Sequence, residues 1–99
     1  REFIIMLDNR PIGVVTIGQM DHWSPEVGYF IGETRLWGKG YGRQAVEEAL
    51  KWLKEHGKQY CHTTIKDNNE RSIRLAESVG FKKLGPAREG ESWYQICLK

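Results

Sequence analysis

Short apolar or alternating runs, separated by turn residues, lie toward both ends of the chain and predict strands. Residues 8–11 carry the Asx and Pro residues of a tight turn. Two longer segments instead repeat apolar residues at helical spacing, and a glycine follows each of them. The predicted strands cover residues 3–7, 12–17, 26–31, 60–65, 81–84 and 93–98, and the predicted helices cover residues 41–56 and the segment between Asn69 and Gly80.

The predicted element order is β-β-β-α-β-α-β-β. An antiparallel start, one βαβ unit and a final hairpin favour an α+β domain, sandwich-like, with a mixed sheet and both helices packed against it. The final hairpin is expected to turn around Gly85-Pro86 and Gly90. A length of 99 residues predicts a single domain over residues 1–99. No cap or helix precedes the first strand, so either the domain is truncated at its N-terminus or it begins with a simple edge strand.

Composition excludes several classes of partner. A net charge of only +2 argues against bulk attraction to nucleic acid or membrane. No apolar run approaches the roughly 20 residues that cross a bilayer. Cys61 and Cys97 have neither the spacing of a disulfide framework nor that of a metal site, so we expect two buried, reduced thiols, no metal and a cytoplasmic location.

Three glycines alternate with larger residues directly before the first predicted helix, in the run Trp37-Gly38-Lys39-Gly40-Tyr41-Gly42. The first N–H groups of a helix have no intrahelical partner and lie at the positive end of its dipole. Glycine there lets a ligand approach the backbone, and Lys39 and Arg43 add positive charge. The pattern is typical of a phosphate site or of a tight turn without a ligand, but its spacing matches neither the P-loop nor the dinucleotide fingerprint.

Two sequence blocks resemble the GNAT superfamily of acyl-CoA N-acyltransferases. The first is the glycine run at residues 37–42, which is similar to the family signature [Q/R]-x-x-G-x-[G/A] but has Trp at its first place. The second is NERSIRLAESVGF at residues 69–81, which is similar to the N-x-x-S-x-x-L-x-E-x-x-G-F of a branch that acetylates ribosomal-protein N-termini and small amines. The resemblance implies a GNAT core that lacks the usual first strand and two helices.

The resemblance also implies acetyl-CoA as the acetyl donor. The glycine turn would hold its pyrophosphate through backbone amides, and residues 30–32 would bond the pantetheine arm as an added strand. Asn69 would contact the same arm, or it only caps the second helix. Arg71 and Arg74 either meet the 3′-phosphate or only solvate their helix. The implied cofactor-binding residues are Phe30, Ile31, Gly32, Trp37, Gly38, Lys39, Gly40, Tyr41, Gly42, Arg43 and Asn69.

The implied reaction moves the acetyl group to a primary amine by direct attack, without a covalent enzyme intermediate. Glu26 is the candidate base for the amine proton, or it is an exposed carboxylate at a strand end. Ser72 matches a serine that lies near the thioester or the cofactor in this branch, or it is a hydroxyl of the capping turn. Ala76 stands where many members carry a Tyr, which leaves Ser72, Tyr94 or water as the general acid.

Three functions fit these features: an active N-acetyltransferase, a non-catalytic CoA-binding or regulatory module, and an α+β interaction domain whose glycine turn binds nothing. A protein N-terminus, a polyamine, an amino acid and an aminoglycoside all fit as the acceptor. The first strand contains the uncharged run FIIML and would present an open sheet edge. We therefore expect a homodimer formed through this strand, or a longer protein that covers it.

Overall fold

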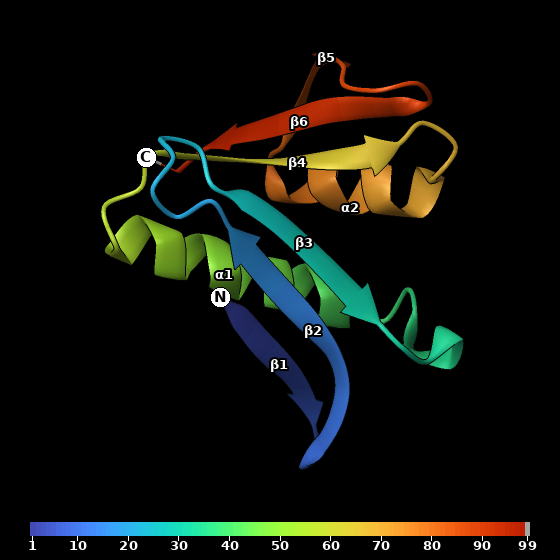
Figure 1. Ribbon diagram of the computed structural model, residues 1–99. Coiled ribbons are helices and arrows are strands. Elements are labelled where there is room, and N and C mark those ends of the chain that lie inside the picture. The colour runs from blue at the N-terminus through green and yellow to red at the C-terminus, as the bar shows by residue number, and fades with distance from the viewer. Residues whose placement is uncertain (99) are drawn as a thin grey trace.

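The computed structural model describes residues 1–98 as six strands and two helices (Figure 1). A short 3-10 helix precedes the first α-helix. Every predicted strand and helix is present, and the predicted ends lie within two residues of the observed ends. The elements are β1 (Glu2–Leu7), β2 (Arg10–Gly18), β3 (Glu26–Ile31), η1 (Thr34–Leu36), α1 (Tyr41–Glu55), β4 (Tyr60–Lys66), α2 (Glu70–Val79), β5 (Lys82–Pro86) and β6 (Glu91–Cys97).

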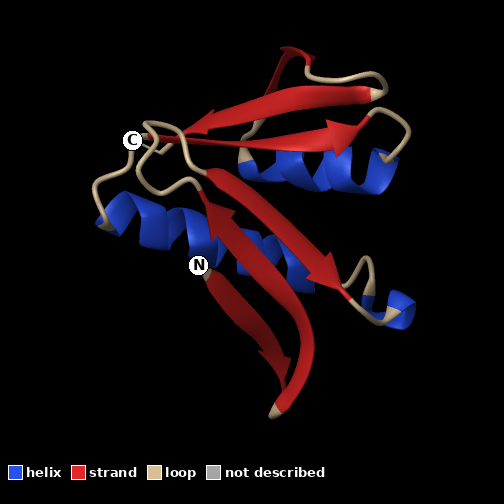
Figure 2. Cartoon of the chain, viewed as in Figure 1, coloured by secondary structure: helices blue, strands red, loops and turns tan. Residues whose placement is uncertain are grey.

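The strands form one mixed sheet in the order β1-β2-β3-β4-β6-β5 (Figure 2). β3 and β4 are parallel, whereas the other neighbouring strands are antiparallel. This confirms the predicted α+β class and mixed sheet. The chain leaves β4 through α2 and enters β5 two positions away, and the final hairpin then brings β6 back between them.

Both helices lie on one face of the sheet, behind it in Figure 1. Alternate residues of the strands point to that face and join helix residues in one apolar core, which includes Val15, Val27, Cys61 and Tyr94 from the sheet and Val46, Ala49, Leu53 and Ala76 from the helices. Within residues 1–98 no helix covers the opposite face, which we call the helix-free face. Because side chains alternate along a strand, this face carries Glu26, Gly28, His62, Thr64, Trp93 and Gln95.

Local sequence explains the first turn. Asp8 and Asn9 have φ values of 51° and 67°, so they form the two-residue hairpin turn whose twist matches the adjoining strands. Asx residues tolerate this left-handed backbone better than most side chains. The predicted turn is therefore confirmed, with Arg10 already in β2.

Two expectations from the sequence are wrong. Gly85 and Pro86 do not form the last turn but belong to β5, because a bulge between Lys83 and Gly85 lets the strand continue. Pro is tolerated there because β5 is an edge strand and needs no N–H on its outer side. Cys97 is exposed rather than buried, since it ends β6 on the side opposite the core, whereas Cys61 is buried as expected.

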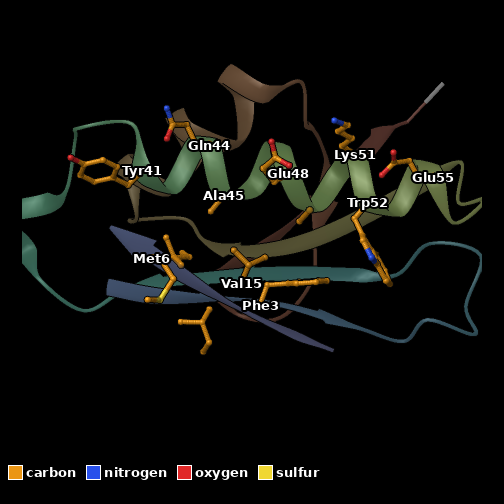
Figure 3. Close-up of a pocket in the computed structure, with 13 residues that line it drawn as sticks. Phe3, Met6, Val15, Tyr41, Gln44, Ala45, Glu48, Lys51, Trp52 and Glu55 are labelled. Carbon is orange, nitrogen blue, oxygen red and sulfur yellow. The ribbon is translucent and has the colours of Figure 1, made fainter. Parts of the chain in front are cut away.

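A groove of about 420 Å³ separates α1 from β1 and β2 (Figure 3). Ala45 and Val15 face each other across it, and the Trp52 ring meets the Phe3 ring edge-on at 5.5 Å between centroids. Tyr41 at the start of α1 is the only residue of the glycine run in its lining. Within residues 1–98 no helix is long and apolar enough to cross a membrane.

Candidate active site

β3 and β4 separate almost as soon as they meet. In the described part of the chain their register has one pair, Glu26 with His62, and the His62 N–H donates a 2.9 Å hydrogen bond to the Pro25 carbonyl. Beyond this pair the strands diverge and leave a cavity of about 430 Å³, with Tyr29 on the β3 side and Ile65 on the β4 side. A gap in the middle of a sheet leaves backbone groups without partners, so it can accept an extended ligand.

A second cavity, of about 720 Å³, lies where the glycine turn faces α2. It shares Tyr29, Asn69, Ser72 and Leu75 with the first cavity, so the two are contiguous. Arg43, Arg71 and Arg74 line it, and none of its lining residues is Asp or Glu. Three guanidinium groups, of which Arg43 also lies 3.7 Å from Glu47 in an exposed ion pair, favour a ligand that carries several negative charges.

The N-terminus of α1 faces this second cavity. Its N-cap, Gly40, has no side chain to accept a hydrogen bond, and the first intrahelical bond runs from Gln44 N–H to the Gly40 carbonyl at 3.0 Å. The N–H groups of Tyr41, Gly42 and Arg43 therefore have no intrahelical partner. The first turn of α1 carries no acidic residue, so the helix supplies no negative charge of its own at this end.

The three glycines serve different purposes. Gly38 and Gly40 have φ values of 78° and 88°, and a Cβ on either would meet no atom within 4 Å. Their backbone is thus open to a ligand. Gly42 instead lies inside α1, where a Cβ would come within 2.9 Å of the Tyr29 ring and 3.2 Å of Leu75. Gly42 therefore also allows α1 to pack closely on β3 and α2, and its contact with a ligand stays a prediction.

Trp37 anchors the chain as it enters the glycine turn. Its indole N–H donates a 3.1 Å hydrogen bond to the Ile31 carbonyl, and Arg71 lies over its ring. Lys39 does not line the cavity, and Tyr41 lines the groove on the other side of α1. Two of the predicted cofactor residues are thus present at the turn without lining the cavity.

The strand residues predicted to meet the pantetheine arm differ in the direction of their backbone groups. The Gly32 N–H donates to the Ile12 carbonyl at 2.9 Å and is already used by β2. Backbone groups alternate in direction along a strand, so those of Phe30 point toward β2 as well. The backbone of Tyr29 and Ile31 points the opposite way, into the gap, on the same side as the Pro25 carbonyl that meets β4.

Asn69 and Ser72 form the N-terminal cap of α2. The Asn69 side-chain oxygen accepts a 3.2 Å hydrogen bond from the Ser72 N–H, so the predicted capping role is confirmed. Both residues also line the two contiguous cavities, which leaves the Asn69 amide nitrogen and the Ser72 hydroxyl beside the gap. Ala76 is buried in the core, and so is Tyr94, one of the candidate acids.

Glu26 lies on the other side of the sheet from these groups. It lines a hollow of about 330 Å³ on the helix-free face. This hollow shares Val27, Gly28, Thr63 and Thr64 with the cavity in the gap, and all four belong to the diverging strands. The gap therefore opens on both faces, toward the arginine-lined cavity on one side and toward Glu26 on the other.

The carboxylate of Glu33, which lies shortly before the glycine turn, pairs with the side chain of the neighbouring Arg35. Arg35 donates a 2.6 Å hydrogen bond to Glu33, and this bond lowers the pKa of the Glu33 carboxyl.

Among residues 1–98 no group of three His, Cys, Asp or Glu residues could hold a metal ion. Burial raises the pKa of Cys61 to about 12, so this thiol is unsuited to act as a nucleophile.

Sequence reasoning missed a polar cluster beside Glu26. His62 is only 9% exposed and Ser24 only 2%, yet their side chains meet on the helix-free face. His62 stands next to Cys61 in an ordinary strand pattern, and Gln95 comes from the last strand. The one feature of the sequence that indicates this cluster is the alternation of side chains along β4, which places His62 on the face opposite the core.

Comparison with known proteins identifies the family. Residues 1–82 match the family described as the acetyltransferase (GNAT) domain. This match covers most of the chain, and the chain belongs to the GNAT acetyltransferase family, which confirms the prediction from the two sequence blocks.

Two relatives match over most of this chain. An uncharacterized protein of Methanocaldococcus jannaschii is 47% identical over 89 residues, which are 90% of this chain and 18% of that protein. A prophage-derived uncharacterized N-acetyltransferase of Bacillus subtilis is 30% identical over 84 residues, which are 83% of this chain and 48% of that protein. The chain thus spans less than half the length of either relative.

Solved structures agree with the family. A domain from Methanocaldococcus jannaschii has a TM-score of 0.92 at 43% identity, over 97% of this chain and 65% of that chain. The ribosomal-protein-S5-alanine acetyltransferase from Vibrio fischeri has a TM-score of 0.84 at 21% identity, over 93% and 57%. A putative acetyltransferase from Salmonella typhimurium, solved with its cofactor acetyl-CoA, has a TM-score of 0.78 at 22% identity, over 92% and 61%. The last two comparisons show a common fold.

Proposed function

We propose that the protein transfers an acetyl group from acetyl-CoA to a primary amine. The observation that carries this proposal is the gap between β3 and β4, which opens on both faces of the sheet. Its helix side leads to the arginine-lined cavity, and its helix-free side leads to Glu26. A donor held on one side and an acceptor held on the other meet in the gap.

The cavity on the helix side fits the charge and length of CoA. The free N–H groups of Tyr41, Gly42 and Arg43 are placed to bind the pyrophosphate, because the open backbone at Gly38 and Gly40 lets it approach. The pantetheine arm would then run into the gap and pair with the backbone of residues 29–31 as an added strand. The Asn69 amide nitrogen remains available to the same arm.

The residues around the gap supply what acetyl transfer requires. Glu26 accepts the proton of the attacking amine, whose nitrogen forms the new C–N bond while the C–S bond of the thioester breaks. The inward-facing N–H groups of Tyr29 and Ile31 stabilise the negative charge on the thioester oxygen. The Ser72 hydroxyl donates a hydrogen bond to the leaving thiolate, which takes its proton from water, since α2 contains no Tyr that could supply it.

The acceptor we propose is a protein N-terminus or a small-molecule amine. Structural neighbours include a ribosomal-protein-S5-alanine acetyltransferase and a spermidine N-acetyltransferase, and these names span both classes. The hollow around Glu26, of about 330 Å³, lies on the helix-free face, which suits an amine that projects from a larger body as well as a free one.

The test is release of free CoA thiol from acetyl-CoA with a panel of amines: N-terminal peptides, spermidine, amino acids and an aminoglycoside. We expect thiol release with at least one amine, and a loss of roughly 100-fold in kcat for Glu26→Gln, in the range of one general base. CoA affinity should not change, and Glu89→Gln, which neutralises an exposed carboxylate in the last hairpin, should leave kcat unchanged. CoA binding without thiol release for any amine would instead indicate a CoA-binding module.

A further inference from the structure

A buried histidine on the helix-free face is not used by the proposed reaction. His62 Nδ1 lies 3.3 Å from Ser24 Oγ, and Gln95 Nε2 donates a 3.3 Å hydrogen bond to the same oxygen. Ser24 comes from the β2–β3 loop, His62 from β4 and Gln95 from β6. Burying three polar side chains costs free energy unless they form hydrogen bonds with one another, as these three do.

The network lies in line with Glu26. In the sheet register Glu26 pairs with His62, and His62 pairs with Gln95, so the three residues form one row across β3, β4 and β6. Their neighbours Val27, Cys61 and Tyr94 are in the core on the opposite face, which places the row on the helix-free face. Adjacent strands are about 4.8 Å apart, so the register places His62 on the strand next to Glu26, whereas Glu2 and Arg1 share the hollow that Glu26 lines.

The hydrogen bonds favour one tautomer of His62. The Gln95 amide donates to Ser24 Oγ, and among the described residues the Ser24 hydroxyl has no other acceptor than His62 Nδ1. We therefore assign the hydroxyl as the donor to Nδ1, which places an N–H group on Nε2.

The second ring nitrogen of His62, Nε2, remains available to a water molecule. It makes no hydrogen bond within residues 1–98, and it is not a fully buried atom without a partner there. The Trp93 ring, with its centroid 5.2 Å away, covers one side of the imidazole, and His22 lies at 6.4 Å. The nearby titratable groups are thus His22, from the β2–β3 loop, and Glu26, the register partner of His62 on β3.

We propose that His62 is a positioning residue for Glu26, an inference that rests on the role proposed for Glu26 as the base. The Nε2–H group donates a hydrogen bond through one water to the Glu26 carboxylate. This fixes one carboxylate oxygen toward the sheet and leaves the other to accept the amine proton. His62 keeps its own proton during the reaction, and Ser24 and Gln95 hold the tautomer that makes it a donor.

The first experiment observes the tautomer without any acceptor. Nitrogen-15 NMR of the side chain should give the pattern of a neutral imidazole protonated at Nε2. Ser24→Ala removes the donor to Nδ1 and should produce a mixture of the two tautomers. A parent protein that is already protonated at Nδ1, or a Ser24→Ala spectrum identical to that of the parent, overturns the proposal.

The second experiment measures kcat with the amine of the panel that gives the fastest thiol release. We expect His62→Phe to lower kcat roughly tenfold and His62→Gln, whose amide can still donate, to restore part of the loss. KM for acetyl-CoA and the dissociation constant of CoA should not change, and this CoA binding also shows that each variant is folded. The matched control is His56→Phe, since His56 stacks on Trp52 at the far end of α1.

A double variant separates this inference from the proposed function. In a Glu26→Gln background, His62→Phe should have no further effect, because its effect passes through the Glu26 carboxylate. An equal tenfold loss in both backgrounds means that His62 acts independently and overturns the proposal. If Glu26→Gln is as active as the parent, the base assignment itself fails, and the inference fails with it. If Glu26→Gln is slow and His62→Phe is fully active, only the inference fails.

Discussion

The guanidinium group of Arg71 lies 3.5 Å from the centre of the Trp37 ring. Since the Trp37 indole N–H is bonded to the Ile31 carbonyl, these two side chains join α2, the glycine turn and the end of β3. The three elements enclose the arginine-lined cavity. A guanidinium group stacked on an indole keeps its N–H groups at the edge of the stack, where they remain available to an anion.

We predict that Arg71→Ala weakens CoA binding roughly tenfold or more, because a hydrogen bond to a charged group contributes roughly 1.5–3 kcal/mol. If Arg71 meets the 3′-phosphate, the same substitution should barely affect binding of 3′-dephospho-CoA. Calorimetric titration with both ligands measures the difference.

The control for Arg71 is Arg88→Ala, which removes an equal charge from the exposed turn before β6, where Arg88 lies 4.0 Å from Glu91. We expect it to leave both affinities unchanged. Equal weakening by the two substitutions would mean that only the net charge of the protein matters, and the assignment of Arg71 to the cavity would be wrong.

The second prediction concerns Gly40, whose backbone we expect to contact the pyrophosphate. Gly40→Ala should lower CoA affinity at least tenfold, because its Cβ enters open space at the cavity wall. The left-handed backbone also makes alanine costly, by roughly 1–2 kcal/mol of stability. Gly57 at the other end of α1 has φ of 82°, against 88° at Gly40, and no atom within 4 Å of its Cβ position. Gly57→Ala should therefore lose similar stability in urea unfolding yet bind CoA normally.

The third prediction follows from Cys61, whose pKa burial raises from 9.0 to about 12. Above pH 9 the unfolded chain loses this thiol proton while the folded protein keeps it, so deprotonation favours unfolding. The free energy of unfolding should fall by roughly 1.4 kcal/mol per pH unit between about pH 9 and pH 12 from this group.

Cys61→Ala removes this contribution. Urea unfolding at pH 7 and pH 10 should show that the stability gap between parent and variant narrows at pH 10 by roughly 1 kcal/mol. A gap that stays constant across this range would show that the thiol titrates alike in the folded and unfolded states.

The fourth prediction concerns β1, which is an edge strand of the sheet formed by residues 1–98 and exposes Ile4 and Met6. We predict that the protein self-associates through this edge at micromolar concentration, and that Ile4→Lys shifts it to monomer, because a charge on an edge strand opposes pairing. Sedimentation velocity measures the change. Leu84→Lys on the opposite edge should have no effect, since the bulge and Pro86 of β5 already hinder pairing there. A parent that sediments as a monomer contradicts the prediction.

The sequence by itself determined the elements, their order and the family. Strands and helices were predictable because the alternation of apolar residues in strands and their helical spacing in helices appear within short segments of sequence. The ends of α2 were predictable because Asn69 caps its N-terminus and Gly80 its C-terminus. The free N–H groups at the glycine turn were predictable for the same reason, since they belong to the helix that follows directly.

Only the tertiary structure decided which groups face one another across the sheet. The side of β3 that meets the gap depends on its register with β2, and this register turns the backbone of Tyr29 and Ile31 toward the gap and that of Phe30 and Gly32 toward β2. The tight packing at Gly42 is visible only once α1, β3 and α2 are placed together, because Tyr29 of β3 and Leu75 of α2 both approach this glycine. The row of Glu26, His62 and Gln95 brings together three strands that are distant along the chain. Register and packing of this kind are set by pairing between distant segments, which no local pattern records.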